Sequence, residues 1–266
     1  SCVCFDISNI LCYILDMNYK YIADLISNAK RITVITGAGI STVSGIPDFR
    51  GKTGIYTTGE YDPYKTFDID YFKKDPSYFQ KFAKGFIEIL EKANPSKMHR
   101  FISMLESKGK LEAVITQNID GLHKKAGNKK VYTVHGTIEH GHCLKCHKTY
   151  TFKEMKGIYL NDKNLFCNIC GGEIKPDVVF FGEQVMFINE SINAVRNCDL
   201  LLICGTSLQI APVSIFPYYV RPDVGIIVIN IGDVIIDNRN VVRINDELER
   251  AAAMLFKEVF NEDIGD

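Results

Sequence analysis

The sequence predicts an α/β fold built on a doubly wound parallel sheet. Short apolar runs, rich in β-branched residues and bounded by turn residues, have the composition of buried parallel strands and cover residues 32–36, 113–116, 178–181, 200–204 and 226–230. Segments with helical periodicity lie between several of these runs. Because strands that alternate with helices favour a parallel sheet covered on both faces, we expect ligands to bind beyond the carboxyl ends of the strands.

Start signals in the sequence predict individual helices. One begins at residues 75–76, where an aspartate precedes a proline, and it carries apolar side chains on one face, namely Phe79, Phe82, Phe86 and Leu90. Another follows residues 94–95, and the last covers 246–260, with Glu249 completing a capping box. The first amphipathic helix is expected after Met17. These helices supply crossovers of the kind that a doubly wound sheet requires.

The composition is that of a soluble globular protein. Hydrophobic residues make up 46 % and charged residues 24 %, so disorder is not expected to dominate. The formal net charge is −1, so no overall field draws the chain toward nucleic acid or an anionic membrane. No apolar run reaches the roughly 18 residues that a membrane-spanning helix needs. We therefore expect no membrane association, no direct nucleic-acid binding and a monomer.

Residues 1–16 form an apolar, cysteine-rich leader without the basic start and cleavage site of a signal peptide. Because Met17 follows directly, this leader is either native upstream sequence or a non-native or untranslated extension. The chain has nine cysteines, four of them in two Cys-x-x-Cys pairs, which is a metal-binding pattern more than a secreted disulfide framework. A reducing, cytoplasmic setting is therefore expected.

The paired Cys-x-x-Cys motifs predict one structural zinc ion, with Cys143, Cys146, Cys167 and Cys170 as ligands. Four thiolates at about 2.3 Å fill a tetrahedral shell and leave no position for a reacting water. The alternative is four surface cysteines without a metal. Three nearby histidines could compete as ligands, but four cysteines already suffice: His140, His142 and His147.

The segment 140–175 contains both cysteine pairs and lacks a long apolar period. It is therefore interpreted as a small inserted zinc-binding module in a Rossmann-like domain formed by residues 17–139 and 176–266. The predicted fold is a Rossmann-like doubly wound parallel sheet with a small inserted zinc-binding module.

A glycine turn follows the first predicted strand. Its sequence, residues 37–41, is Gly-Ala-Gly-Ile-Ser, where backbone amides could approach a pyrophosphate. The third glycine of the dehydrogenase fingerprint is absent, since Val43 stands there, so a plain structural turn is the alternative. The polar, turn-rich continuation through residue 63 favours a flexible loop over a cofactor, with Tyr56 and Tyr61 as lid residues or as half-buried surface aromatics.

Polar side chains also follow two other predicted strands. Gln117, Asn118 and Asp120 come after strand 113–116, and amide and carboxylate groups can hold a carboxamide and a ribose. Strand 131–134 leads into His135, whose unperturbed pKa of about 6.5 suits a general base near neutrality. A purely structural histidine is the alternative.

With these motifs in order, the chain resembles the sirtuin family, the NAD-dependent protein lysine deacylases, from about Tyr21 to Leu255. Besides the paired Cys-x-x-Cys, the matching segments are 37–50 (GAGISTVSGIPDFR), 116–123 (TQNIDGLH), 134–136 (VHG), 181–183 (FGE) and 205–207 (GTS).

The resemblance implies a role for each matching residue. The phosphates would be held by Gly37, Ala38, Gly39 and Ile40. The cofactor loop would contain Asp48, Phe49 and Arg50, with Phe49 shielding the reactive sugar carbon. The ribose and nicotinamide amide would be bound by Gln117, Asn118, Ile119 and Asp120. The adenosine half would be lined by Gly205, Thr206, Ser207, Asn230, Ile231 and Gly232. The catalytic set would be His135 as the base with Asn118 and Asp120.

The resemblance also implies the reaction and the substrate. The acyl-lysine oxygen attacks the nicotinamide ribose, nicotinamide leaves, and the products are free lysine, nicotinamide and O-acyl-ADP-ribose; the protein mainly orients reactants and supplies one base. The peptide would lie as an added strand between residues 207–212 and a segment formed by Val179, Phe180, Phe181, Gly182 and Glu183. His123 would be a structural hydrogen-bonding residue.

The preferred acyl group follows from one helix. The branch of the sirtuin family that acts on acidic acyl groups carries a Tyr-x-x-Arg pair in the helix after the cofactor loop. At the corresponding positions this chain has Ala83 and Phe86. A succinyl carboxylate would then be buried without a partner, so acetyl or longer aliphatic groups are expected. The alternatives are protein ADP-ribosyl transfer or NAD hydrolysis at the same site, and a non-catalytic NAD-binding scaffold.

Overall fold

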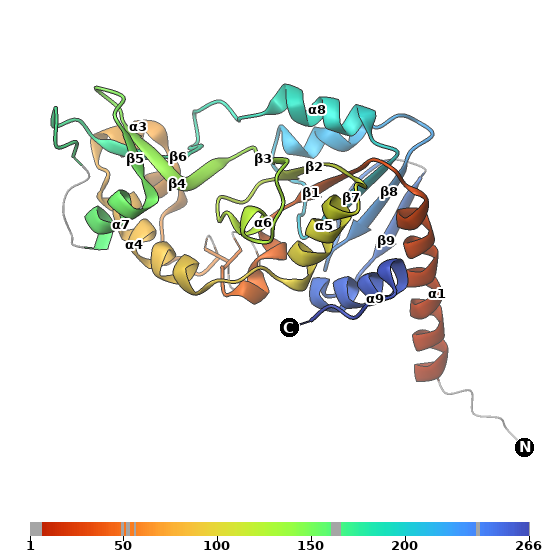
Figure 1. Ribbon diagram of the computed structural model, residues 1–266. Helices are drawn as coiled ribbons and strands as arrows, with labels where there is room; N and C mark the ends of the chain where they lie inside the picture. Colours follow the sequence, from red (N-terminus) through yellow and green to blue (C-terminus); the bar gives the residue numbers. More distant parts are fainter. Residues whose placement is uncertain are drawn as a thin grey trace, which may run out of the picture.

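The computed structural model describes residues 7–48, 51, 54–55, 57–160, 166–237 and 240–265, with side chains in the first helix from Asn18 onward. Figure 1 shows a larger lobe built on a parallel sheet and a smaller lobe on the left of the view. Within the described part of the chain, no helix combines the length and apolar character needed to cross a membrane.

The larger lobe is organised by a six-stranded sheet. Its strands are β1 (Ile32–Thr36), β2 (Leu111–Thr116), β3 (Val131–Thr133), β7 (Leu200–Cys204), β8 (Gly225–Ile229) and β9 (Val241–Ile244). Their order is β3-β2-β1-β7-β8-β9, and every neighbouring pair is parallel. The predicted doubly wound sheet is confirmed. Because β2 and β7 flank β1 on opposite sides, the switch point lies between β1 and β7, where such sheets bind ligands.

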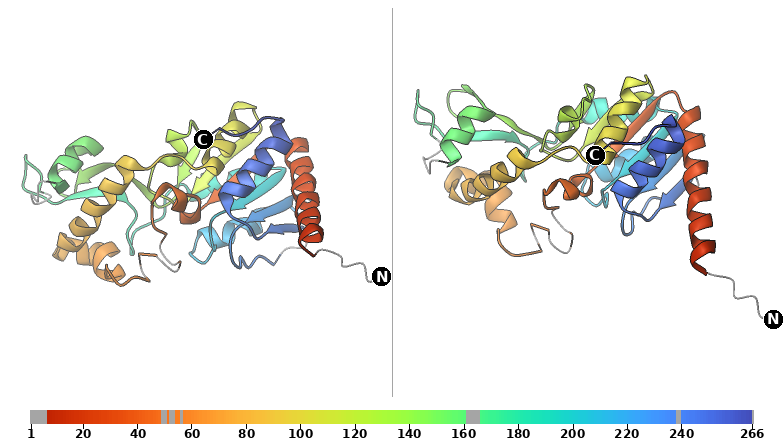
Figure 2. Two further views of the ribbon diagram at one scale, coloured as in Figure 1. Left: turned by 90° about the horizontal axis from the view of Figure 1, so that it is seen from below. Right: turned by 60° about the horizontal axis from the view of Figure 1, so that its bottom comes forward.

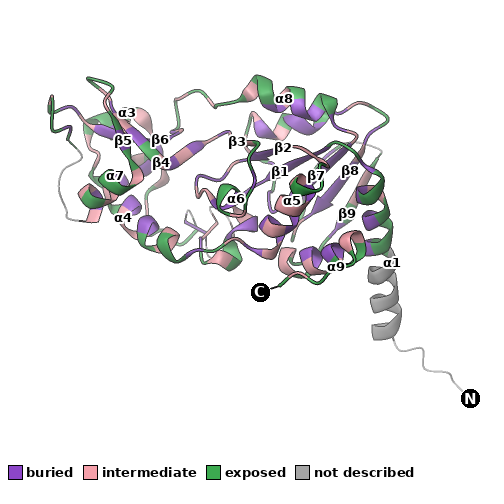
Figure 3. Ribbon diagram, viewed as in Figure 1, coloured by how far each residue is buried: buried purple, intermediate pink, exposed green. Residues whose placement is uncertain are grey.

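Helices cover both faces of this sheet. One face carries α1 (Ile7–Asn28), α5 (Lys97–Ser107) and α9 (Leu248–Phe260), and the other carries α8 (Ile188–Asn197) and the 3₁₀ helix η3 (Val213–Tyr219). Figures 1 and 2 show these layers. Alternate residues of β1 and β7 enter different cores: Val34 and Leu202 face α1 and α5, whereas Ile35 and Ile203 face η3. The central strands β1, β7 and β8 are therefore buried, as their colour in Figure 3 shows, whereas the edge strands β3 and β9 are only partly covered.

The smaller lobe contains an antiparallel sheet with the order β5-β4-β6. Its elements are β4 (Gly136–Cys143), β5 (Thr149–Thr151), α7 (Phe152–Leu160) and β6 (Ile174–Val178). Positions 140 and 175, between which the sequence places the inserted module, lie within β4 and β6. This lobe also includes helices from earlier in the chain, α2 (Pro63–Phe67), α3 (Ile69–Lys74) and α4 (Ser77–Lys92), which share one apolar core with it.

Aromatic side chains join the helices α2, α3 and α4 to the rest of the smaller lobe. Phe79 of α4 lies edge-on to Tyr159 of α7, with ring centroids 6.3 Å apart, and 5.0 Å from the ring of Phe180, which follows β6. Phe67 packs edge-on against Phe82 at 4.8 Å. Of the predicted apolar face of α4, Phe79, Phe82 and Phe86 are buried and Leu90 is partly buried. That face packs against α7 and Phe180 in the core that α4 shares with the small sheet.

The structure corrects the strand expected at residues 178–181. Strand β6 ends at Val178 and pairs antiparallel with β4, so that Gly136 lies opposite Val178 and Cys143 opposite Ile174. Phe181 lies beyond the strand and is 49 % exposed. A short apolar run carries no information about the direction of its partner, and here the partner is the antiparallel β4.

The ends of two helices also differ from the sequence-based expectation. Helix α1 begins at Ile7, before Met17, so the expected leader and the first helix overlap. Helix α9 begins at Leu248 with Glu247 at its N-cap, and no side chain caps it. Glu249 does not complete a capping box; its carboxylate accepts from the backbone amide of Lys97 at 2.8 Å. The Glu249 carboxylate, which the local spacing predicted to cap α9, therefore binds the start of α5 instead.

Candidate functional site

The glycine turn after β1 lies at the switch point of the sheet. It forms the short 3₁₀ helix η1 (Ala38–Ile40), and the backbone amide of Gly39 donates to the carbonyl of Gly205, beyond β7, at 2.9 Å. A Cβ on Gly37 would lie 2.7 Å from Cβ of Thr206, and one on Gly39 would lie 2.9 Å from Cα of Gly205. Glycine is thus required because two backbone turns meet here.

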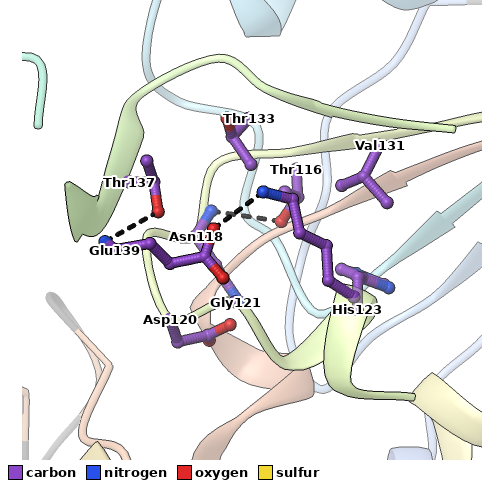
Figure 4. A pocket seen from close by; sticks show the side chains of 10 residues that line it. Thr116, Asn118, Asp120, Gly121, His123, Val131, Thr133, Thr137 and Glu139 are labelled. Carbon is purple, nitrogen blue, oxygen red and sulfur yellow. Dashed lines mark hydrogen bonds and ion pairs between the residues drawn. The ribbon is translucent and has the colours of Figure 1, made fainter. Parts of the chain in front are cut away.

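A polar network joins the loop after β2 to this turn. The side-chain amide of Asn118 donates to the carbonyl of Gly37 and to Oγ of Ser41, both at 3.1 Å. Ser41 Oγ donates to Oδ2 of Asp120 at 2.7 Å, and the backbone amide of Leu122 donates to Oδ1 at 2.8 Å. Figure 4 shows Asn118 and Asp120 on this loop. The sequence motif contains Ser41, but sequence reasoning did not assign it to the site.

Gln117 and Thr206 link the loop after β2 to the turn after β7. The Gln117 side chain donates to Oγ1 of Thr206 at 3.1 Å, and that oxygen accepts from the amide of Leu208 at 3.1 Å. Ser207 is exposed beside them. Residues predicted from separate motifs therefore come together at the carboxyl ends of β1, β2 and β7.

His135 stands directly beyond β3. Its Nδ1 lies 3.0 Å from the carbonyl oxygen of Gln117. A carbonyl can only accept, so Nδ1 carries the proton and the lone pair of the neutral ring is on Nε2. Burial lowers the pKa of His135 from its usual 6.5, and the Gln117 carbonyl opposes that shift. Nε2 of this half-buried ring is thus a base that is unprotonated at neutral pH.

Asp120 is a carboxylate in a confined position. Burial raises its pKa above the usual 3.8, while the hydrogen bonds from Leu122, Ser41 and Asn118 act in the opposite direction. Those donors favour the ionised form. They also fix the orientation of both oxygens.

His123 and His99 form a buried pair behind the site. Nε2 of His123, on the short helix α6 (Leu122–Lys125), lies 2.9 Å from Oγ1 of Thr36 at the end of β1, and its ring lies edge-on to His99 at 4.6 Å between centroids. Burial lowers the pKa of His123 to about 4 and that of His99 well below 6.5. Through its hydrogen bond to Thr36, the neutral His123 ring anchors the end of β1, the strand that precedes the glycine turn.

This pair predicts that the protein loses stability below pH 6.5. Between pH 6.5 and about 4 the unfolded chain binds a proton at residue 123 that the folded chain does not, so the free energy of unfolding falls as the pH falls. At about 1.4 kcal/mol per pH unit, His123 alone accounts for roughly 3 kcal/mol. Asp120 acts in the opposite direction, so the contribution of His123 is obtained by comparison with a variant.

The measurement is urea unfolding at pH 7 and pH 5. The free energy of unfolding should fall more steeply for the wild type than for His123→Gln. His140→Gln, at an exposed position of β4, should behave as the wild type does. Equal pH dependence in the wild type and His123→Gln would contradict the prediction.

The predicted adenosine-side residues follow two neighbouring strands, with 205–207 after β7 and 230–232 after β8. The amide of Gly205 donates to the carbonyl of Ile229 at 3.2 Å, which places the turn after β7 beside the end of β8. Asn230 is half-buried, its side chain donates to the carbonyl of Ile231 at 3.0 Å, and Ile231 is 68 % exposed. Gly232 donates to Oδ1 of Asn245, a residue that no sequence motif indicated, at 3.2 Å.

The segment after β6 connects His135 to the smaller lobe. The amide of Val179 donates to the carbonyl of His135 at 2.8 Å, and the amide of Phe181 donates to the carbonyl of Phe67 at 2.7 Å. Ile69 in turn donates to the carbonyl of Phe181 at 3.1 Å. Phe181 and Gly182 are exposed. The predicted peptide-binding segment is thus fixed beside His135 along one edge.

Part of the predicted cofactor loop can be placed. Asp48 is half-buried, and its Oδ1 accepts from the amide of Gly51 at 3.0 Å. Tyr61 is half-buried against the ring of Phe82, with centroids 5.5 Å apart. The predicted residues Phe49, Arg50 and Tyr56 lie outside the described residues.

The four cysteines form one cluster in the smaller lobe. The ligand atoms of Cys143, Cys146, Cys167 and Cys170 all lie within 4.8 Å of one another. Two of the sulfur pairs are separated by 3.4 and 3.6 Å. Sulfurs bound to one tetrahedral zinc ion at about 2.3 Å would be about 3.8 Å apart, so the donor set fits a structural zinc ion. His142 instead pairs with Asp177, with 2.6 Å between Nδ1 and Oδ1.

Comparisons with known proteins agree with this site. Residues 37–212 match the model of the Sir2 family. The chain is 37 % identical to an NAD-dependent protein deacetylase of Thermotoga maritima over 91 % of this chain and 98 % of that protein.

Solved Sir2 structures have the same fold. One, described with the mechanism and regulation of Sir2 enzymes, has a TM-score of 0.84 at 32 % identity and covers 92 % of this chain and 99 % of its own. A Sir2 complex with a p53 peptide and NAD+ has a TM-score of 0.82 at 34 % identity and covers 91 % and 99 %. With its glycine turn, polar loop, histidine and cysteine cluster in the family's order, this chain belongs to the Sir2 family, the sirtuins.

Proposed function

We propose that the chain is an NAD-dependent protein lysine deacylase that releases free lysine, nicotinamide and O-acyl-ADP-ribose. The observation that carries the proposal is the geometry of His135, which is half-buried beyond β3 and holds its proton on Nδ1, 3.0 Å from the Gln117 carbonyl. This leaves the lone pair on Nε2 of a ring that is bonded to the loop after β2. That loop is in turn hydrogen-bonded to the turns after β1 and β7. Membership of the Sir2 family supports the same reaction.

NAD fits the residues that meet at the switch point. We assign the phosphates to the turn Gly37, Ala38, Gly39 and Ile40, and the ribose and carboxamide to Gln117, Asn118, Ile119 and Asp120. The adenosine half is assigned to Gly205, Thr206, Ser207, Asn230, Ile231 and Gly232. When bound, NAD supplies a ribose carbon with a good leaving group. Asp48, Phe49 and Arg50 belong to the loop that would cover it.

The chain's own residues have distinct tasks in this proposal. Asn118 and Asp120 are held rigidly by Ser41, so they can orient a ribose without reorganising. His135 takes a proton from a ribose hydroxyl through Nε2. Segment 179–183 positions the acyl-lysine peptide as an added strand beside His135.

The direct test is to identify the products. Incubation of the chain with an acetyl-lysine peptide should give free lysine peptide and O-acetyl-ADP-ribose by mass spectrometry, and only when NAD is present. NAD consumption without deacylation would instead favour hydrolysis or ADP-ribosyl transfer. Binding of NAD without any reaction, across several acyl chains, would favour a scaffold.

The activity of the free enzyme should have its acidic half-maximal point below pH 6.5. The base must be neutral to act, so kcat/KM rises as the pH passes the pKa of His135 and then levels off. Burial lowers that pKa from 6.5. A pH profile at fixed ionic strength, with circular dichroism at each pH, measures this. A half-maximal point at pH 7 or above would contradict it.

Acetyl peptides should react at least about tenfold faster than succinyl peptides of the same sequence. Ala83 and Phe86, the positions compared with the Tyr-x-x-Arg pair, are buried in an aromatic core. Phe86 lines a cavity of about 390 Å³ together with Phe82, Ile89 and Ile55. Among the described residues, the charged side chains in its lining are Glu60, Glu88 and Lys92. A succinyl carboxylate would meet two carboxylates there, and Ala83 and Phe86 supply no cation at the positions compared with the Tyr-x-x-Arg pair. Comparable kcat/KM values for the two peptides would contradict this preference, and longer aliphatic acyl peptides should also react.

We also propose the division along the chain into a Rossmann-like domain, residues 17–139 and 176–266, and a zinc module, residues 140–175, against which the helices α2, α3 and α4 of the first part pack. A cytoplasmic monomer without direct nucleic-acid contacts is part of the same proposal. Its support is the thiolate donor set of the zinc site, which a reducing compartment preserves, and the nearly balanced charge of the sequence.

A further inference from the structure

Lys175 on β6 is buried although it carries a charge. Its side chain is only 4 % exposed and its Nζ lies 2.9 Å from Oε2 of Glu183. Nζ also donates to the carbonyls of Val178 at 2.6 Å and Pro176 at 3.2 Å. A buried lysine is tolerated only when its donors are satisfied in this way. Every one of these acceptors lies in the stretch that runs from β6 to Glu183.

The partners of Lys175 close the turn after β6. Oε2 of Glu183 accepts from the backbone amide of Phe180 at 2.8 Å, and the amide of Glu183 donates to the carbonyl of Phe180 at 3.0 Å. Nζ of Lys175 also lies 4.3 Å from the centroid of the Phe180 ring. Gly182 provides the positive φ of 92° that the turn needs. The ammonium group of Lys175 therefore binds residues at both ends of the turn formed by residues 178–183.

This turn is attached to the site on its other edge. Val179 donates to the carbonyl of His135, and Phe181 exchanges hydrogen bonds with Phe67 and Ile69. Phe181 is 49 % exposed while Phe180 is 2 % exposed, so successive residues alternate between solvent and core as in a strand. One edge of segment 179–183 is hydrogen-bonded to His135, Phe67 and Ile69. The buried ammonium group of Lys175 fixes its conformation from the core side.

We propose that Lys175 is a positioning residue for the acyl-lysine peptide. By bonding to Val178 and Glu183 it holds segment 179–183 in the conformation that receives the peptide, and it takes no part in NAD binding. This inference rests on the proposed function, in which that segment binds the peptide. Lys175 itself touches none of the residues assigned to NAD in the contacts described above.

The test separates the two substrates kinetically. Lys175→Met removes the charge and keeps the length of the side chain, and it should raise the KM for an acetyl peptide about tenfold or more. The KM for NAD should change by less than about twofold, because the turns after β1, β2 and β7 are not altered. Lys175→Arg keeps a cation and should restore the peptide KM to within about threefold of the wild type.

Thermal melting and zinc content are measured on every variant. Glu183→Gln provides a second probe, since it retains an acceptor for Phe180 but loses the ion pair, and it should raise the peptide KM while leaving that for NAD unchanged. If Lys175→Met does not fold, Glu183→Gln and Lys175→Arg decide the question. An unchanged peptide KM in Glu183→Gln, or equal losses for both substrates in Lys175→Met, would overturn the proposal.

Failure of the proposed function gives a different result. If the wild type does not deacylate, binding of the acetyl peptide is measured by calorimetry in the presence of NAD. Peptide binding that weakens about tenfold in Lys175→Met and recovers in Lys175→Arg would still support the positioning role. Wild-type binding that is absent would overturn the inference together with its premise.

Discussion

His135→Ala is expected to lower kcat for deacylation by about two to four orders of magnitude, the range that loss of a general base typically produces. The Nδ1 hydrogen bond to the Gln117 carbonyl holds Nε2 in one orientation, and none of the other histidines in the described residues has this position beyond a strand of the parallel sheet. NAD binding should change little, because the glycine turn and the polar loop retain their mutual hydrogen bonds.

The measurement combines single-turnover kinetics with NAD binding by calorimetry. His140→Ala is the matched control, since that histidine is exposed on β4, and it should keep its full rate. A rate in His135→Ala within about tenfold of the wild type would remove the histidine from the chemistry. Loss of NAD binding together with the rate would point to a structural role for it.

Loss of the zinc ion should unfold the smaller lobe and abolish activity. Four thiolates within 4.8 Å of one another repel unless a cation binds them, and Cys143 and Cys167 are buried in the core that α4 shares with the small sheet. Structural zinc in isolated zinc fingers contributes about 10–16 kcal/mol to folding, so the stability of the lobe should depend strongly on the ion. Segment 179–183 depends on that lobe and should lose its conformation with it.

Cys167→Ser tests this, with Cys198→Ser as the control. Elemental analysis should find about one zinc ion per chain in the wild type and in Cys198→Ser, and far less in Cys167→Ser. The Cys167→Ser variant should also be cleaved rapidly by protease within residues 136–178. A zinc-free protein with unchanged melting and activity would show that the cluster has no structural ion.

Some parts of the site could be predicted because their signals are local. The glycine turn and the Gln117–Asp120 loop each follow a strand that the apolar pattern identifies, and His135 follows the expected strand 131–134. A parallel sheet brings such strand ends together. The spacing of the two Cys-x-x-Cys pairs is enough to predict a zinc site. Ser41 lies within a recognised motif, but its bond to Asp120 joins residues 79 positions apart, which no spacing rule reveals.

Taken by itself, the sequence predicted the parallel sheet except for β9, the polar residues at its carboxyl edge and the cluster of four cysteines, because strand periodicity and ligand spacing are properties of short segments. Only the tertiary structure decided that β6 runs antiparallel to β4, that α4 packs within the zinc lobe, and that Glu249 accepts from the first amide of α5 instead of capping α9. It also decided that Lys175 is buried against Glu183. In each of these cases the partner is chosen by packing after distant segments meet, so the pattern of a single segment does not contain the answer.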